Sequence, residues 1–252
     1  MNLLLEAVRW ILSGEPGRGL SAIPVALLEH LVYTFGSVLL AALIAVPIGW
    51  AIGHTGRGRD VAVAISGAAR AIPSFGLLIL LVLIFGVLHK PEAAVITFVL
   101  LAIPSLLAGA YTGLEAIDRS TIDAARALGM TEWQILWRIE VPLGLPLLVA
   151  GVRSAVLQVV ATVTIAAYVD LGGLGQYIIT GIPLRRFDIV LGGAILVAAL
   201  ALVLDGLFAL LQRAAVSRGL RLTASRRGPS GRVHHPQPSA ASSPTVPDQA
   251  LT

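Results

Sequence analysis

The most informative stretch of this sequence is residues 123–142, which read DAARALGMTEWQILWRIEVP. A short helix is predicted at its start, because Asp123 suits the positive end of a helix dipole in the first turn. Ala124 and Ala125 are strong helix formers, and Gly129 is predicted to end this helix or to allow a tight bend. A helix with such small side chains suits insertion into a groove of a partner protein.

A second short helix is predicted directly after Gly129. Thr131 can cap it, with Gln134 at the capping-box position three residues later. An apolar stripe at helical spacing follows, made of Ile135, Leu136 and Ile139. Pro142 then starts the next apolar run. The pattern predicts two short helices joined at a glycine and held just outside an apolar segment.

The composition points to lipid as the solvent for most of the chain. Of 252 residues, 56% are hydrophobic and 13% are charged, whereas a soluble domain carries about 25% charge. Too few polar side chains exist to cover a water-facing surface. The chain has no cysteine, so it forms no disulfide and no thiolate metal site.

Five stretches have the roughly 20 mostly apolar residues that a membrane-spanning helix needs. They are residues 31–53, 61–88, 93–111, 143–168 and 189–211. The second contains Arg70 and Pro73, and two interpretations stay open. It forms either one long tilted helix kinked at Pro73, or a short cytoplasmic-side helix followed by a span. Both count as one crossing, so the sequence predicts an all-α polytopic membrane protein with about five transmembrane helices.

Arginine is concentrated in alternate connections between these spans. Residues 54–60 hold two arginines, residues 112–142 hold three, and residues 213–252 hold six against one acid. The positive-inside rule places these segments in the cytoplasm. We therefore expect a multi-pass plasma-membrane protein with its N-terminus outside and its C-terminus in the cytoplasm.

The two ends of the chain differ from its middle. Residues 1–26 begin with apolar side chains at helical spacing and are predicted to form an N-terminal segment at the membrane interface. Residues 213–252 are rich in Arg, Ser, Pro and Gly and predict a disordered basic cytoplasmic tail. Basic tails also occur in nucleic-acid-binding proteins, but on a membrane chain they more often mark the cytoplasmic side, so no nucleic-acid partner is expected. Residues 27–212 are assigned to the transmembrane domain.

Residues 123–142 resemble the cytoplasmic signature of permease subunits of bacterial ABC importers. That signature is Glu-Ala-Ala, three residues, Gly, nine residues, Ile, one residue and Leu-Pro. This chain keeps every spacing, with Asp123 in place of Glu and Val141 in place of Leu. The resemblance implies a loop that docks in a cleft of a separate ATPase subunit. The residues that match the signature and would carry this coupling are Asp123, Ala124, Ala125, Gly129, Ile139 and Pro142.

Outside this loop, the resemblance is closest to the osmoprotectant branch of these permeases, which imports glycine betaine, carnitine, choline and related quaternary amines. The stretches that carry it are residues 71–74, 111–113, 129–131, 141–143, 150–154 and 171–175. Two pairs depart from the pattern: Arg70-Ala71 replaces the usual Gln-Thr, and Asp170-Leu171 replaces the usual Gly-Ala. The resemblance implies the type I ABC importer permease fold and an osmoprotectant as substrate, and it leaves the precise solute open.

The resemblance also implies the partners. They are cytoplasmic ATP-binding subunits, an extracytoplasmic solute-binding protein, and a second permease that is either identical or similar. The sequence has no Gly-x-x-x-x-Gly-Lys-Ser/Thr loop, so the partner subunit binds ATP and this chain needs no cofactor. It has no His-Glu-x-x-His motif and no histidine central to a span, so neither a metal site nor an enzyme is expected.

Several polar or conformationally special residues within or beside the spans are candidates for the pathway or for helix packing. They are Arg70, Pro73, Ser74, Arg153, Gln158, Tyr168 and Asp170. An ionisable residue at mid-bilayer costs about 2.5–3.5 kcal/mol, so such residues face protein or water. Arg153 and Gln158 are the best candidates for helix–helix packing. Tyr168 and Asp170 would suit attraction of a quaternary amine near the outer mouth, although Tyr168 equally fits an aromatic belt.

Two alternative functions remain open at this point. A permease of the same type for another small solute, such as an amino acid, would have the same spans and the same loop. An autonomous channel or secondary transporter would explain the spans, but not the spacing within residues 123–142.

Overall fold

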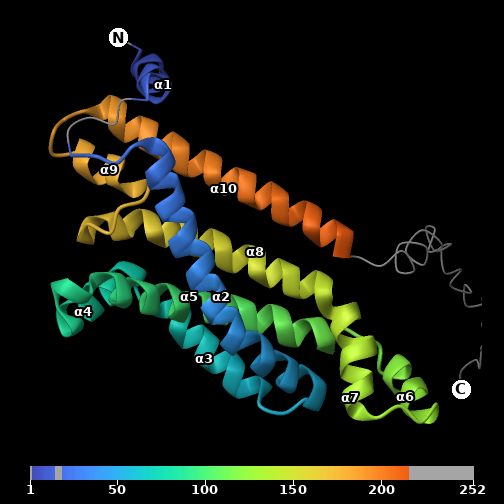
Figure 1. The fold of residues 1–252 in the computed structure, drawn as a ribbon. Helices are drawn as coiled ribbons and strands as arrows, with labels where there is room; N and C mark the ends of the chain where they lie inside the picture. Colours follow the sequence, from blue (N-terminus) through green and yellow to red (C-terminus); the bar gives the residue numbers. More distant parts are fainter. Residues whose placement is uncertain (1, 15–18, 216–252) are drawn as a thin grey trace, which may run out of the picture. The chain divides into compact units, whose positions relative to one another are not determined.

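The computed structural model describes residues 2–14 and 19–215, and within these ranges it contains helices and no strand. Figure 1 shows how the helices follow one another. Their bounds are α1 Leu3–Ser13, α2 Ile23–Thr55, α3 Arg59–Ala71, α4 Ser74–Phe85, α5 Lys90–Glu115, α6 Arg119–Ala127, α7 Glu132–Ile135, α8 Val141–Ala166, α9 Gly175–Gly181 and α10 Phe187–Ala215. Short 3₁₀ turns lie at Val87–His89 and Ala167–Val169, and a π-helical turn lies at Leu136–Glu140.

Four helical stretches are long and apolar enough to cross a membrane, and the bent pair of α3 and α4 brings the number to five if it counts as one span. The four are Ile23–Thr55, Val87–Glu115, Glu132–Val169 and Phe187–Ala215. The prediction of an all-α membrane protein with about five transmembrane helices is confirmed. The first span starts at Ile23, ahead of the predicted residue 31.

The second predicted span is broken at Pro73. The axes of α3 and α4 differ by 83°, so residues 61–88 do not form one continuous kinked helix. Proline lacks an N–H group and pushes the preceding residue into extended geometry, and Ile72 accordingly has φ −73° and ψ 125°. The 13 residues of α3 extend about 20 Å, too little to cross a hydrocarbon core of about 30 Å alone.

Glycine pairs bring the central helices α5 and α8 into close contact. A Cβ atom added to Gly109 on α5 would lie 2.8 Å from the Cα of Gly151 on α8. One turn further along, a Cβ on Gly113 would lie 2.7 Å from the carbonyl oxygen of Gly144. Small residues are the usual means by which membrane helices approach closely, since lipid supplies no hydrophobic force between them. The tightly packed α5 contacts both α2 and α8, and Figure 1 shows α2 running across these two helices.

The N-terminal helix α1 rests on α10. The Trp10 ring packs edge-on against Tyr177 of α9 with ring centroids 5.1 Å apart, and it lies where a Cβ on Gly192 would stand. Leu4 and Leu12 on the same helix remain exposed. The amphipathic helix expected in residues 1–26 is therefore present, with one face packed against protein and apolar side chains left on another.

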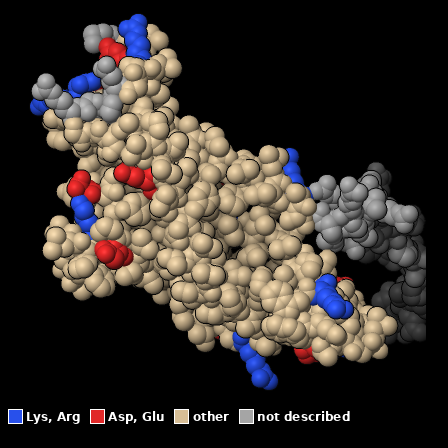
Figure 2. All heavy atoms as spheres, viewed as in Figure 1, with Lys and Arg blue, Asp and Glu red and all other residues tan. Residues whose placement is uncertain are grey.

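Charged side chains avoid the middle of the visible face. Figure 2 shows that Lys, Arg, Asp and Glu gather toward its two ends and leave a wide central area without them. This distribution is the one expected of a protein whose middle lies in hydrocarbon. The predicted tail lies almost entirely beyond residue 215 and so outside the described residues.

Candidate functional site

The segment with the signature spacing folds as two short helices, α6 and α7, and we call residues 119–135 the α6–α7 loop. Asp118 caps α6, because its carboxylate accepts a hydrogen bond of 2.9 Å from the backbone N–H of Ser120. This backbone hydrogen bond lowers the pKa of Asp118. The prediction that Asp123 lies in the first turn is wrong, since α6 starts at Arg119 and Asp118 takes the capping role.

Gly129 ends the first helix as predicted. Its φ is +80°, in the left-handed region that costs an L-residue about 1–2 kcal/mol. The next amide, that of Met130, donates back to the carbonyl of Ala125 over 3.2 Å and closes the turn. A Cβ atom on Gly129 would meet nothing within 4 Å, so backbone conformation alone requires glycine here.

Thr131 forms the predicted capping box with Gln134. The Thr131 hydroxyl accepts from the Gln134 amide over 3.3 Å, and the Gln134 side chain accepts from the Thr131 amide over 3.0 Å. The second helix then continues without a break through the π-helical turn into α8, with Pro142 in the first turn of α8. Proline has no backbone N–H, so this continuous helix lacks one backbone hydrogen bond at Pro142, directly after the π-helical turn.

A small apolar cluster holds the loop together. Its buried members are Ile122, Ala125 and Ile135, and Ile117, Met130 and Ile139 pack against them. Ala125 is only 4% exposed, so it faces the loop's own core and not solvent. Ala124, by contrast, is exposed. Of the two alanines predicted to carry the coupling, Ala124 thus presents its side chain to solvent and Ala125 packs inside the loop, because helix geometry puts neighbouring residues on different faces.

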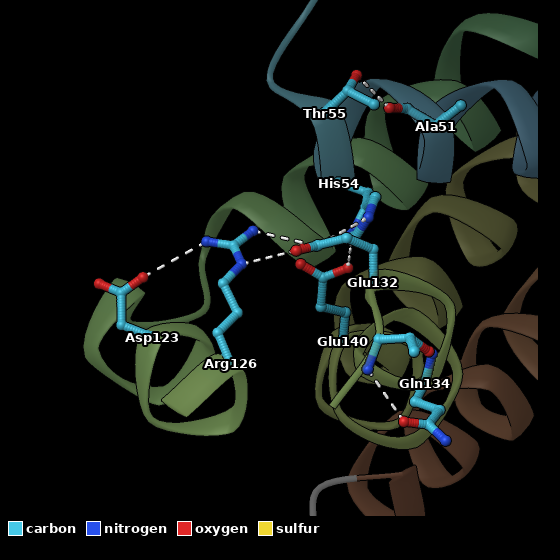
Figure 3. Close-up of polar contacts among 9 residues, drawn as sticks. Ala51, His54, Thr55, Asp123, Arg126, Glu132, Gln134 and Glu140 are labelled. Carbon is cyan, nitrogen blue, oxygen red and sulfur yellow. Dashed lines mark hydrogen bonds and ion pairs between the residues drawn. The ribbon is translucent and has the colours of Figure 1, made fainter. Parts of the chain in front are cut away.

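Charged side chains link the loop to the end of α2 (Figure 3). Arg126 donates to both carboxylate oxygens of Glu132 over 2.8 and 3.1 Å and lies 3.4 Å from Asp123. His54, in the last turn of α2, lies 3.5 Å from Glu132 and 2.5 Å from Glu140. The hydrogen bonds from Arg126 to Glu132, and to a lesser degree the contact with Asp123, raise the pKa of Arg126.

His54, Glu132 and Glu140 were not singled out from the sequence. His54 and Glu140 are 86 residues apart, and no local spacing connects them. A usable signal was present at Glu140, whose carboxylate directly precedes an apolar span. Such a residue needs a partner when buried. Glu140 is 4% exposed in the structure.

Arg153 and Gln158 both join α8 to neighbouring helices, as helix-packing residues. Arg153 donates to the two carboxylate oxygens of Asp205 on α10 over 2.6 and 2.7 Å. Gln158 accepts from Ser105 on α5 over 3.5 Å. Arg153 and Gln158 point to different helices and do not form a pair with each other.

The remaining pathway candidates lie at the bend and at the outer connections. Arg70 and Pro73 are exposed, and Ser74 is half-buried at the start of α4.

Tyr168 is 63% exposed, and its ring packs edge-on against Phe75, with centroids 5.3 Å apart. Asp170 has a positive φ of 57° and accepts from the Lys90 ammonium group over 2.7 Å. The Asp170 side chain stays 97% exposed in this ion pair. Among residues 2–14 and 19–215, no cluster of His, Cys, Asp or Glu is suited to a metal ion.

The fold and the loop define a class: a polytopic helical subunit with a short helical element outside its spans. The chain matches the family described as "Binding-protein-dependent transport system inner membrane component" over residues 22–217, and it belongs to that family. It is therefore a multi-pass membrane subunit of a transport system with the type I ABC importer permease fold, and it is not an enzyme.

Similar proteins come from several bacteria. The chain is 28% identical to a glycine betaine/carnitine/choline transport system permease protein of Bacillus subtilis, over 77% of this chain and 88% of the relative. It is 32% identical to a carnitine transport permease protein of Listeria monocytogenes, over 70% and 80%. It is 33% identical to an osmoprotectant import permease protein of Salmonella typhimurium, over 77% and 91%.

Solved structures share the fold. An inward-facing MetNI methionine ABC transporter aligns with a TM-score of 0.67 and 23% identity, over 77% of this chain and 96% of that one. An amino acid ABC transporter with histidines aligns with a TM-score of 0.61 and 17% identity, over 83% and 96%. At these identities the likeness concerns the fold alone.

Proposed function

We propose that this chain is the permease subunit of an ATP-driven importer for quaternary-amine osmoprotectants such as glycine betaine, carnitine or choline. The observation that carries the proposal is the identity of 28–33% to permeases named for these solutes, over at least 70% of the chain. The solved structures named for methionine and amino acids are less similar, at 17–25% identity.

The α6–α7 loop supports a docking role for a separate ATPase. Ala124 is exposed on α6, and Leu128 and Trp133 expose 84% and 68% of their surface. Exposed apolar side chains of this kind, on α6, at its C-terminal end and on α7, fit a groove in a protein partner. ATP-driven closure of two such partners would displace the loop and switch the access of the pathway, and hydrolysis would reset it.

The proposed assembly also contains a second permease and an extracytoplasmic binding protein. The family description names a binding protein as part of the transport system. The binding protein would deliver the solute to the outer side of the paired permeases. The loop that meets the ATPase would lie in the cytoplasm together with the C-terminus, and the N-terminus would lie outside, as the arginine distribution indicates.

The alternative substrate class is an amino acid, imported by the same mechanism; the likeness to a methionine transporter concerns the fold alone and does not favour it. Uptake of labelled solutes separates the two. Cells without other uptake systems would receive this chain with its ATPase and binding protein. We expect uptake of glycine betaine, choline or carnitine, and growth rescue by glycine betaine at high salt. Uptake of methionine without any quaternary amine would overturn the substrate assignment and leave the importer assignment in place.

A further inference from the structure

The helix that joins the α6–α7 loop to the membrane contains a π-helical joint. Residues Leu136–Glu140 form this joint between α7 and α8. π-helical turns are rare, occur mostly as single turns within α-helices, and are frequent at functional sites and at kinks. The joint is therefore the point at which the loop and α8 can change their relative angle.

The last two turns of α2 contact this joint along one face. His54 and Glu140 approach to 2.5 Å. One turn earlier on α2, the Trp50 ring meets Trp137 edge-on, with centroids 5.5 Å apart. Residues four apart on α2 lie on a common face of that α-helix, so Trp50 and His54 both face the joint. The two contacts therefore act side by side and fix the angle between α2 and the joint.

The His54–Glu140 contact is shielded from solvent. The Glu140 side chain is 5% exposed and the His54 side chain 16% exposed. Removing one partner of a shielded polar pair leaves the other without compensation, so each side chain holds the other in place. The contact thus fixes Glu140 at the end of the joint.

His54 also contacts the α6–α7 loop. The second ring nitrogen of His54 lies 3.5 Å from Glu132 on α7, and Glu132 holds Arg126 on α6 through two hydrogen bonds. Figure 3 shows the Glu132 and Glu140 side chains next to each other, both close to the His54 ring. One histidine of α2 therefore touches both sides of the joint.

We propose that His54 is a positioning residue that keeps the π-helical joint rigid. When the α6–α7 loop is displaced, α8 then moves with it, whereas a flexible joint would bend and leave α8 in place. We call this role of His54 the brace. The proposal rests on the proposed function, because it takes the loop as the docking element for the ATPase. Without His54, the ATPase would still bind the loop and hydrolyse ATP. The outer end of α8 would then respond less to ATP.

A spin label at the outer end of α8 tests this without knowledge of the solute. Because the chain has no cysteine, Tyr168→Cys introduces a unique labelling site at an exposed position. The complex would contain this labelled chain and a cysteine-free variant of its ATPase in lipid nanodiscs. The label spectrum would be recorded without nucleotide and with ATP plus vanadate. In the chain that retains His54, the spectrum should contain two populations of the spin label, and their ratio should change when ATP and vanadate are added.

Three variants separate positioning from stability. His54→Leu removes both polar contacts and should reduce the ATP-dependent change in the population ratio by about tenfold, within the usual range of allosteric coupling. His54→Gln keeps an N–H donor for Glu140 and should retain most of the response. The double variant His54→Leu/Glu140→Leu also removes the unpaired carboxylate. This double variant should assemble with the ATPase as well as the unsubstituted chain does. The ATP-dependent change in its label populations should stay as small as in His54→Leu.

The outcomes are distinct. Normal ATPase binding and hydrolysis with a lost label response in His54→Leu and in the double variant would support the brace. A full response in either variant would overturn it, since the polar contacts would then be dispensable. If His54→Leu fails to assemble, the double variant alone decides between these outcomes. If the label does not respond to ATP even with His54 present, the proposed function fails first, and the brace fails with it.

Discussion

Arg153 on α8 and Asp205 on α10 form a two-bond ion pair that joins helices from sequence segments 52 residues apart. Both residues belong to apolar spans, and their side chains are 33% and 34% exposed. An ionised residue at the centre of a span costs about 2.5–3.5 kcal/mol on insertion scales. The pair supplies each charge with a partner and thereby fixes α10 against the core of α2, α5 and α8.

Asp205→Ala should lower the thermal unfolding temperature of the purified protein in detergent, because it leaves the Arg153 guanidinium unpaired. Arg153→Leu/Asp205→Leu should recover most of this loss, since no charge then remains between the helices. If the double variant is less stable than Asp205→Ala, the pair contributes net stability beyond charge compensation. The measurement is the melting curve of each variant at one detergent concentration.

Gly129→Val should uncouple the subunit without removing it from the membrane. A β-branched side chain at φ +80° is strained by about 1–2 kcal/mol or more, and relief of that strain would reorient α6. Gly129→Asn is the matched control, because asparagine tolerates left-handed geometry better. We expect the amount of ATPase that co-purifies with the permease to fall for valine and to stay nearly normal for asparagine. Equal retention of the ATPase by both variants would contradict a docking role for this turn.

Glutamate substitutions at the neighbouring residues Ala124 and Ala125 should both impair coupling to the ATPase, but for different reasons. Ala124→Glu adds charge to an exposed helix face, so it should weaken ATPase binding while the loop stays folded. Ala125→Glu buries a carboxylate among Ile122 and Ile135, so it should unfold the loop. Limited proteolysis of the purified permease distinguishes them: only Ala125→Glu should create a new cleavage site in the loop. Asp123→Glu keeps the charge and should be silent in both assays.

The raised pKa of Tyr177 predicts that the folded protein loses stability at high pH. Burial, followed by the nearby charge of Glu29, raises its pKa to about 12, and its hydroxyl donates to the Ser21 carbonyl over 2.7 Å. In the unfolded chain tyrosine ionises near pH 10, so between about 10 and 12 the unfolded state binds fewer protons and stability falls as pH rises. Tyr177→Phe should lower stability at neutral pH and flatten this slope. An unchanged slope in melting temperature over that range would show that other groups cause it.

Reporter fusions test the orientation. A fusion after Leu88 should report the extracytoplasmic side, and a fusion after Leu211 should report the cytoplasm, since the arginine-rich segments alternate with the spans. Alkaline phosphatase is active only outside the cytoplasm, so it should be active at the first site and inactive at the second. Phosphatase activity after Leu211 would invert the proposed topology.

The sequence by itself determined the class of fold and the turn within the α6–α7 loop. Long apolar runs and sparse charge require helices in lipid, because every backbone polar group there must be paired within its own segment. Two features of the loop could also be predicted from nearby residues alone: the end of α6 at Gly129 and the Thr131 capping box. Left-handed geometry and side-chain capping depend on residues within a few positions.

Only the tertiary structure decided which side chains meet across helices. The pairs His54–Glu140 and Arg153–Asp205 join residues 86 and 52 positions apart, and periodicity carries no information about such partners. The structure also decided the inward direction of Ala125 and the 83° bend at Pro73. A proline predicts that a helix is interrupted, but packing against α5 and α8 sets the angle of the two pieces. Local chemistry thus specifies where helices start and stop, while the contacts between them depend on the whole arrangement.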